Sequence, residues 1–151
     1  MKKLIAALTI LTFVCSEMNA QQTEIELVRS AFKLEKKAKV AEFMQLSDSA
    51  AEKFWPIYNK YETERSAIGD KRIKLLETYA KTYENLDGPT AEKLWKESAS
   101  IQTAEVSLRR RYANMVKKKV SPVAALNFYM VEDYISTAIK NELYTSIPTT
   151  P

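Results

Sequence analysis

Histidine is absent from this sequence, cysteine occurs once and glycine only twice in 151 residues. Without histidine the commonest general base is missing, and a single cysteine allows no disulfide within the chain. Two isolated glycines leave no glycine-rich loop for phosphate binding. We therefore expect a protein that is not an enzyme.

The same absences bear on metals and cofactors. Transition-metal sites favour imidazole and thiolate ligands. Outside the first twenty residues the soft ligands are Met44, Met115 and Met130, which suit only an ion such as Cu(I). Methionine at helical spacing more often fills a core. We expect no metal site and no cofactor.

Scarce glycine also argues against sheet-rich folds, because tight hairpins need residues at positive φ. Alanine, glutamate, lysine and leucine are abundant, as long helices prefer. We expect an all-α fold. The formal net charge of +4 is mildly basic and does not single out nucleic acid as a partner.

The first twenty residues have the pattern of a secretory signal peptide: Lys2 and Lys3, an apolar stretch over 4–14, and a small residue at Ala20. The apolar stretch is shorter than the roughly 20 residues that span a bilayer. A buried helix and lipidation at Cys15 are the alternatives. We predict export to the periplasm with cleavage near Ala20. The rest of the chain is then one helical domain over 21–145 and a frayed tail over 146–151.

Helix-start signals occur at Thr23, Ser47, Thr90 and Ser121. Thr23 forms a capping box with Glu26, and Ser121 precedes a proline that suits the first helical position. Pro56 and Gly69 interrupt the second pattern and predict a curved rod. The predicted helices cover residues 24–45, 48–86, 90–118 and 122–145.

The second and third predicted helices each carry a coiled-coil seam at spacings of three and four residues. A short loop folds such helices into an antiparallel hairpin, in which facing residues have numbers summing to about 177. This arithmetic sets Arg72 opposite Glu105 and Arg65 opposite Tyr112. The pair Arg72–Glu105 is either a switchable ion pair or, as we favour, a structural pair that fixes the register.

Glu132 lies on the apolar stripe of the fourth predicted helix, among residues such as Phe128. A buried carboxylate needs a partner. The first candidate is Arg65, followed by Arg72 or Arg109, and a structural ion pair is favoured over a functional site.

Two segments resemble each other at a spacing of 74 residues, 46–55 (LSDSAAEKFW) and 120–129 (VSPVAALNFY). Each has a hydrophobic residue before a serine and an aromatic pair one to two turns into a helix. The interpretation is an internal duplication, with chance agreement of two helix starts as the alternative.

Paired helix starts of this kind resemble the Leu-Thr-x-x-Gln motifs of the Spy/CpxP family of small periplasmic proteins. The stretches 54–61 (FWPIYNKY) and 128–132 (FYMVE), followed by Ile147-Pro148, are similar to a larger relative group, so the resemblance covers about residues 40–148. Serine replaces threonine in both copies, and Ala50 and Ala124 stand where the motif has glutamine. The role of that glutamine is therefore not carried over.

The resemblance implies an elongated, curved, cradle-like helical bundle, often a homodimer. It implies ATP-independent, chaperone-like holding of unfolded proteins or a part in the envelope stress response. The alternative is a sensor or regulatory adaptor for a membrane-anchored signalling partner. Some relatives are heavy-metal sensors, a function that the missing histidine disfavours.

Two basic runs lie near the end of the third predicted helix. A basic surface with exposed aromatic side chains can hold acidic or partly unfolded chains, or contact anionic lipid headgroups. The alternative is a solvated helix end whose cations complement the helix dipole. The candidate partner-binding residues are Arg109, Arg110, Arg111, Tyr112, Lys117, Lys118 and Lys119.

Overall fold

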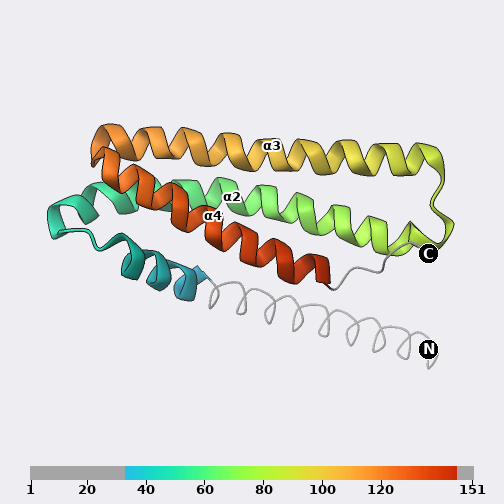
Figure 1. Cartoon of the computed structure of the whole chain (residues 1–151), viewed down its shortest axis with the longest axis horizontal. Helices are drawn as coiled ribbons and strands as arrows, with labels where there is room; N and C mark the ends of the chain where they lie inside the picture. The colour runs from blue at the N-terminus through green and yellow to red at the C-terminus, as the bar shows by residue number, and fades with distance from the viewer. Residues whose placement is uncertain (1–32, 146–151) are drawn as a thin grey trace, which may run out of the picture. The chain divides into compact units, whose positions relative to one another are not determined.

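The computed structural model describes residues 33–145, all of them helix or short connections without a strand. Residues 33–44 are helical, followed by α2 (Asp48–Thr82), the 3-10 turn η1 (Tyr83–Asn85), α3 (Gly88–Lys119) and α4 (Pro122–Thr145) (Figure 1). The predicted all-α fold is confirmed. The signal peptide over 1–20 and the tail over 146–151 lie outside the described residues.

The chain divides into two compact units, Met1–Glu42 and Phe43–Pro151, and α2, α3 and α4 all belong to the second. The predicted single domain over 21–145 therefore spans this division.

α2 and α3 form the predicted antiparallel hairpin. Leu75, Leu94 and Ile101 are the buried centre of its seam, and Ile68 and Leu86 pack against them. α2 remains one continuous helix through Pro56 and Gly69.

The turn of the hairpin differs from the prediction in one detail. Thr90 does not precede the third helix. α3 begins at Gly88, and the Asp87 carboxylate accepts a hydrogen bond from the backbone N–H of Thr90 at 2.8 Å. Pro89 then occupies the first turn, where its missing N–H costs no hydrogen bond. Asp87 is therefore the cap.

α4 runs antiparallel to α3 and parallel to α2, with which it shares an aromatic cluster. Phe128 of α4 lies 5.0 Å from Tyr61 and 6.2 Å from Phe54, both on α2 (ring centroids). Tyr112 of α3 lies 5.5 Å from Tyr61. These four rings are buried, so they form the centre of the three-helix core.

Candidate functional site

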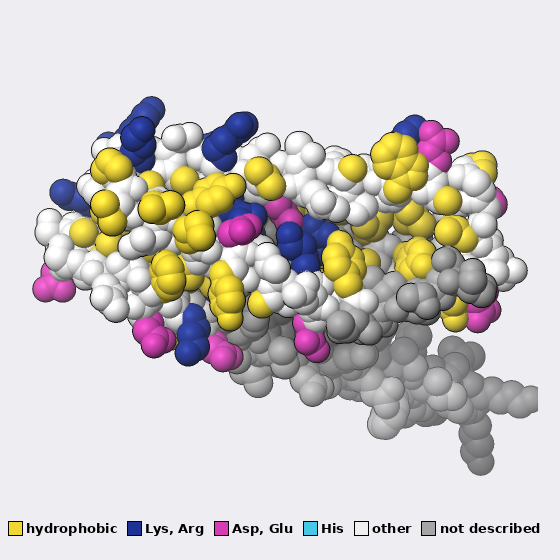
Figure 2. All heavy atoms as spheres, in the orientation of Figure 1, with side chains coloured by type: hydrophobic (Ala, Val, Ile, Leu, Met, Phe, Trp, Pro, Cys, Tyr) yellow, Lys and Arg dark blue, Asp and Glu magenta, His cyan; other side chains and the backbone are white. Residues whose placement is uncertain are grey.

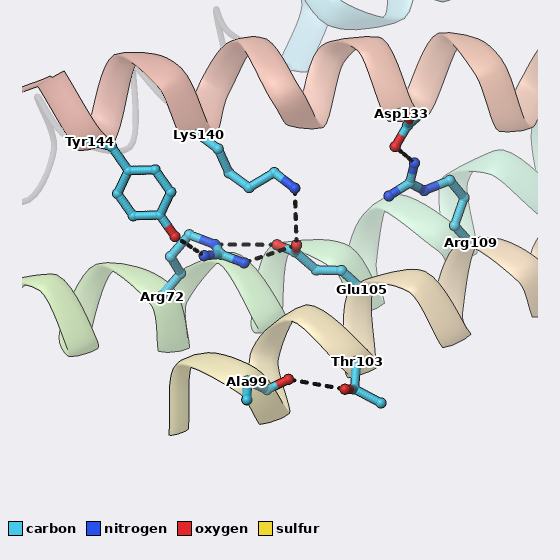
Figure 3. Close-up of polar contacts among 8 residues, drawn as sticks. All are labelled: Arg72, Ala99, Thr103, Glu105, Arg109, Asp133, Lys140 and Tyr144. Atoms are coloured by element: carbon cyan, nitrogen blue, oxygen red, sulfur yellow. Dashed lines mark hydrogen bonds and ion pairs between the residues drawn. The ribbon is translucent and has the colours of Figure 1, made fainter. Parts of the chain in front are cut away.

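The predicted pair Arg72–Glu105 forms and ties three helices together (Figure 3). Arg72 Nη2 lies 2.9 Å from Glu105 Oε2, and Arg72 Nε lies 3.3 Å from the other carboxylate oxygen. From α4, the hydroxyl of Tyr144 accepts a hydrogen bond from Arg72 Nη1 at 2.9 Å, and Lys140 Nζ lies 3.9 Å from Glu105. Only 3% of the Arg72 side chain is exposed. A buried guanidinium with all these partners is a structural junction between α2, α3 and α4.

Glu132 is fully buried, as the stripe on α4 predicts. Its Oε1 accepts a hydrogen bond from the hydroxyl of Tyr58 at 3.0 Å. Burial, and then the charge of Glu132, raise the pKa of the Tyr58 phenol well above its ordinary value, so this hydroxyl stays protonated and donates. A tyrosine partner was not among the sequence candidates, although Tyr58 and Glu132 are separated by the repeat spacing of 74.

The three arginines proposed for Glu132 have other ion-pair partners. Arg72 pairs with Glu105, and Arg109 pairs with Asp133, so neither fills the predicted role. Arg65 donates to Glu62 at 2.9 Å. Burial lowers the pKa of Arg65, but the charges of Glu62 and then Glu132 outweigh it and raise that pKa overall. The influence of Glu132 on Arg65 is therefore electrostatic.

Two residues of the predicted partner-binding surface are buried, which corrects that prediction. Arg109 is 3% exposed; it pairs with Asp133 of α4, and its guanidinium lies 5.1 Å from the centre of the Tyr129 ring. Tyr112 is also 3% exposed, and its hydroxyl donates to Glu64 at 2.6 Å. Both residues are buried because other helices cover them. Arg109 points toward α4, and Tyr112 points toward α2.

The other basic residues remain on the surface. Arg111 is exposed but pairs with Glu64 of α2. Within residues 33–145, no acidic side chain pairs with any of Arg110, Lys117, Lys118 and Lys119, all exposed. Cationic side chains project from the end of α3 that leads into α4 (Figure 2). The accessible cationic surface is thus narrower than the sequence predicted.

α4 carries a second surface that the sequence analysis missed. Four apolar or aromatic side chains at spacings of three and four residues are more than half exposed: Val123, Leu126, Met130 and Tyr134. We call these four residues the α4 stripe. Among the residues of α4 from Pro122 to Ala138, the only exposed charge is Asp133. The α4 stripe is therefore an apolar helix face without the usual charged side chains.

The three methionines within residues 33–145 are divided between core and surface. Met44 is buried at 3% exposure, whereas Met130 is 53% exposed in the α4 stripe and Met115 is 38% exposed on α3. Within the described residues, no group of three or more histidine, cysteine, aspartate or glutamate side chains is arranged to hold a metal ion.

A groove of about 870 Å³ lies between α2 and α3. Its apolar wall includes Ile68 of the seam and the buried Leu108 of α3, and its rim includes Arg110 and Lys118. We call it the hairpin groove. The full lining is Glu64, Ala67, Ile68, Ala104, Ser107, Leu108, Arg110, Arg111, Asn114, Met115 and Lys118.

The hairpin groove and α4 use different sides of α3. Glu105 and Arg109 of α3 contact α4, whereas Ala104, Ser107 and Arg111 line the groove. Because successive residues of an α-helix are about 100° apart, these two sets lie on separate stripes of α3. α4 leaves this groove open.

No helix within residues 33–145 is both long enough and apolar enough to cross a membrane. Comparisons with protein-family models, with curated proteins and with solved structures find no match for this chain.

Proposed function

We propose that this protein is a non-enzymatic periplasmic protein of the Spy/CpxP type that holds partly unfolded polypeptides without ATP. The observation that carries the proposal is the α4 stripe, which leaves four large apolar or aromatic side chains in solvent. Contiguous exposed apolar surface on a soluble domain marks a site for binding other molecules.

The composition of the α4 stripe suits many different clients. Met130 and Leu126 are flexible side chains that adapt to irregular surfaces, and Tyr134 adds a large ring with a polar end. Between Pro122 and Ala138 the only exposed charge is Asp133, which is paired with Arg109, so this surface imposes little pattern on the charges of its client. Weak and broad binding of exposed apolar segments follows from these properties.

The cations beside the α4 stripe support the same function. Lys117, Lys118 and Lys119 end α3 and are separated from α4 by only two residues. Exposed charges of one sign accelerate encounters with chains of the opposite charge. Acidic unfolded proteins are therefore expected to be captured faster than basic ones, and this difference is expected to shrink as salt is added.

The direct test is suppression of aggregation. The purified protein is added without ATP to an unfolding client near equimolar ratio. The triple variant Leu126→Ser, Met130→Ser and Tyr134→Ser removes three of the four side chains of the α4 stripe without touching the core. The control is Trp95→Ser with Val106→Ser, which removes exposed apolar side chains from α3 (61% and 49% exposed).

The proposal predicts that the native protein and the control variant suppress aggregation of the client and that the triple variant does not. No suppression by the native protein at several-fold excess would sink the chaperone function. Arg109 is left intact, because neutralising a buried arginine paired with Asp133 would disturb the fold itself.

A second candidate function is a regulatory adaptor that binds one folded signalling partner. The hairpin groove favours it, because a groove with an apolar wall and a charged rim suits one defined segment better than many unfolded ones. A regulator binds its partner tightly at one-to-one stoichiometry, so binding isotherms separate it from a holding chaperone.

A further inference from the structure

The α2–α3 hairpin has two sides, and the chain itself fills one of them with a helix. α4 lies there with Phe128 and Val131 buried in the core. Its Asp133 neutralises Arg109, which also stacks on Tyr129. On that side the hairpin therefore accepts a largely apolar helix face that carries the buried Glu132 and the flanking Asp133.

The hairpin groove on the other side also offers an apolar wall and a flanking arginine, but no segment within residues 33–145 occupies it. Ile68 and Leu108 form its apolar wall, with Met115 beside them. Arg110 follows Arg109 directly in sequence, lines the groove and pairs with no acid in the described chain. The two neighbouring arginines thus lie on different sides of α3, and only Arg109 is neutralised by an acid of the described chain.

Small side chains along the hairpin groove allow close approach. Ala67, Ala104 and Ser107 are all exposed in its lining. Helices pack by ridges fitting into grooves, and small residues let the backbone of a partner come near. The lining from Ala104 to Lys118 spans about 21 Å of α3, at about 1.5 Å per residue, so it matches a partner helix of about 14 residues.

The charge of the rim selects an acidic partner. Arg110 and Lys118 are about 12 Å apart along the axis of α3, which corresponds to carboxylates about two turns apart on a partner helix. The only acid in the lining is Glu64, and it already accepts from Arg111 and Tyr112. The hydrogen bonds from Tyr112 and then Arg111 lower the pKa of Glu64, so it stays charged beside Arg111 at neutral pH.

We propose that the hairpin groove binds an acidic amphipathic helix of a partner protein, laid along α3 on the side opposite α4. A helix suits this groove better than an extended chain, because a helix satisfies its own backbone hydrogen bonds. The uncharged polar side chains in the lining are only Ser107 and Asn114, too few to pair with the whole backbone of an extended chain. This surface is separate from the α4 stripe, so binding here is independent of the chaperone function.

The probe is a fluorescently labelled peptide of about 16 residues, designed as a helix with a leucine face and glutamates two turns apart. A matched peptide has lysine at each glutamate. Fluorescence anisotropy measures the binding of each peptide to the purified protein. Vesicles of phosphatidylglycerol, measured by co-sedimentation, test an anionic membrane as the alternative ligand.

Three sets of variants locate the binding. The double variant Arg110→Gln with Lys118→Gln is expected to weaken binding of the acidic peptide about three- to tenfold, the range for two partly exposed ion pairs. Its control, Lys81→Gln with Lys93→Gln, changes the net charge equally at exposed positions outside the lining and is expected to leave affinity unchanged. Ala104→Phe places a ring in the groove at an exposed position and is expected to abolish binding.

The third set removes an acid from the rim. Glu64→Gln releases Arg111 from its ion pair while keeping an acceptor for the hydroxyl of Tyr112, and it is expected to tighten binding of the acidic peptide about threefold. Glu97→Gln, an equal change of charge at an exposed position outside the lining, is the control.

The proposal is supported if the acidic peptide binds more tightly than the lysine peptide and the variants change its affinity as stated above. Equal binding of both peptides overturns it, as does binding that neither Ala104→Phe nor the double variant weakens. Absence of peptide binding at about 1 mM also overturns it. If neither peptide binds, but the protein binds vesicles and Arg110→Gln with Lys118→Gln reduces that binding, the two cations contact an anionic membrane instead.

Discussion

Phe54 and Phe128 occupy equivalent positions of the two repeated segments, and their rings pack edge to face with centroids 6.2 Å apart. Tyr58 and Glu132, also separated by 74 residues, are joined by a hydrogen bond of 3.0 Å. The repeat spacing is therefore also a contact spacing, because α2 and α4 lie parallel with their helix starts side by side.

The contact between Phe54 and Phe128 predicts a large loss of stability on truncation. Both rings are at most 1% exposed, so replacing either with alanine leaves a cavity that costs about 3–5 kcal/mol. The double variant is expected to lose about 1 kcal/mol less than the sum, the size of an aromatic pair interaction. Urea unfolding of the two single variants and the double variant measures this coupling. Additive losses would mean that the two rings stabilise the core independently.

The junction at Arg72 predicts an asymmetry between single and double variants. Glu105→Leu leaves a guanidinium without its carboxylate at a site where only 3% of the Arg72 side chain is exposed, and it is expected to cost about 3 kcal/mol. Arg72→Met with Glu105→Leu removes both charges and is expected to recover most of that loss. Thermal unfolding and denaturant titration give the comparison. If the double variant is less stable than either single variant, the ion pair adds net stability to the folded protein, in addition to fixing the register of the hairpin.

The hydrogen bond from Tyr58 to Glu132 predicts a smaller effect. Tyr58→Phe removes the hydroxyl and leaves a buried carboxylate oxygen with one donor fewer, which is expected to cost about 1–3 kcal/mol. Tyr83→Phe is the matched control, since the Tyr83 hydroxyl donates to Glu84 at an exposed position. A loss at Tyr83 equal to that at Tyr58 would contradict the importance of the buried bond.

The cap at Asp87 predicts a specific pH dependence. Hydrogen bonds from Thr90 hold the pKa of Asp87 below its ordinary value, so the native state favours the charged form. The stabilisation is present above the unfolded-state pKa, near 3.9, and is lost as pH falls through the lower folded-state pKa. Asp87→Asn keeps a cap and is expected to remove this acid-side loss, whereas Asp87→Ala lowers the melting temperature at neutral pH.

Melting temperatures of the native protein and both variants between about pH 2 and 7 check the prediction for Asp87. Identical acid-side slopes in the native protein and Asp87→Asn would show that other carboxylates account for the loss.

The helices and the hairpin register were predictable because their signals are local or periodic. Seam residues at spacings of three and four define one face of each helix, and a short turn then fixes which residues meet. Glu105 is the acid on the stripe of the third predicted helix and Arg72 lies opposite it in this register, so their contact was predictable. The start of α3 does not follow from the sequence, because both Asp87 and Thr90 are residue types that cap helices.

The surface of α3 could not be predicted from composition alone. Arg109, Arg110 and Arg111 form a single basic run in the sequence, but about 100° of helical rotation separates each from the next. Arg109 therefore meets Asp133 of α4, Arg111 meets Glu64 of α2, and Arg110 faces solvent. Which side α4 covers depends on tertiary packing.

The α4 stripe was missed for a related reason. α4 carries apolar residues on two faces, with Phe128 and Val131 buried and Leu126 and Met130 exposed. Hydrophobic periodicity cannot choose between two apolar faces. Burial in the folded chain separates the core face from the face available to a partner.

The central claim is that the α4 stripe contacts unfolded proteins, and site-specific photo-crosslinking tests it most directly. A photoreactive amino acid replaces Met130 in the α4 stripe (53% exposed), or Trp95 on α3 (61% exposed) as a control of at least equal exposure. Each protein is irradiated with a client in its native and its unfolded state. The account predicts crosslinks from position 130 to the unfolded client alone, and few from position 95. Equal crosslinking from both positions, or crosslinking to the native client, would contradict it.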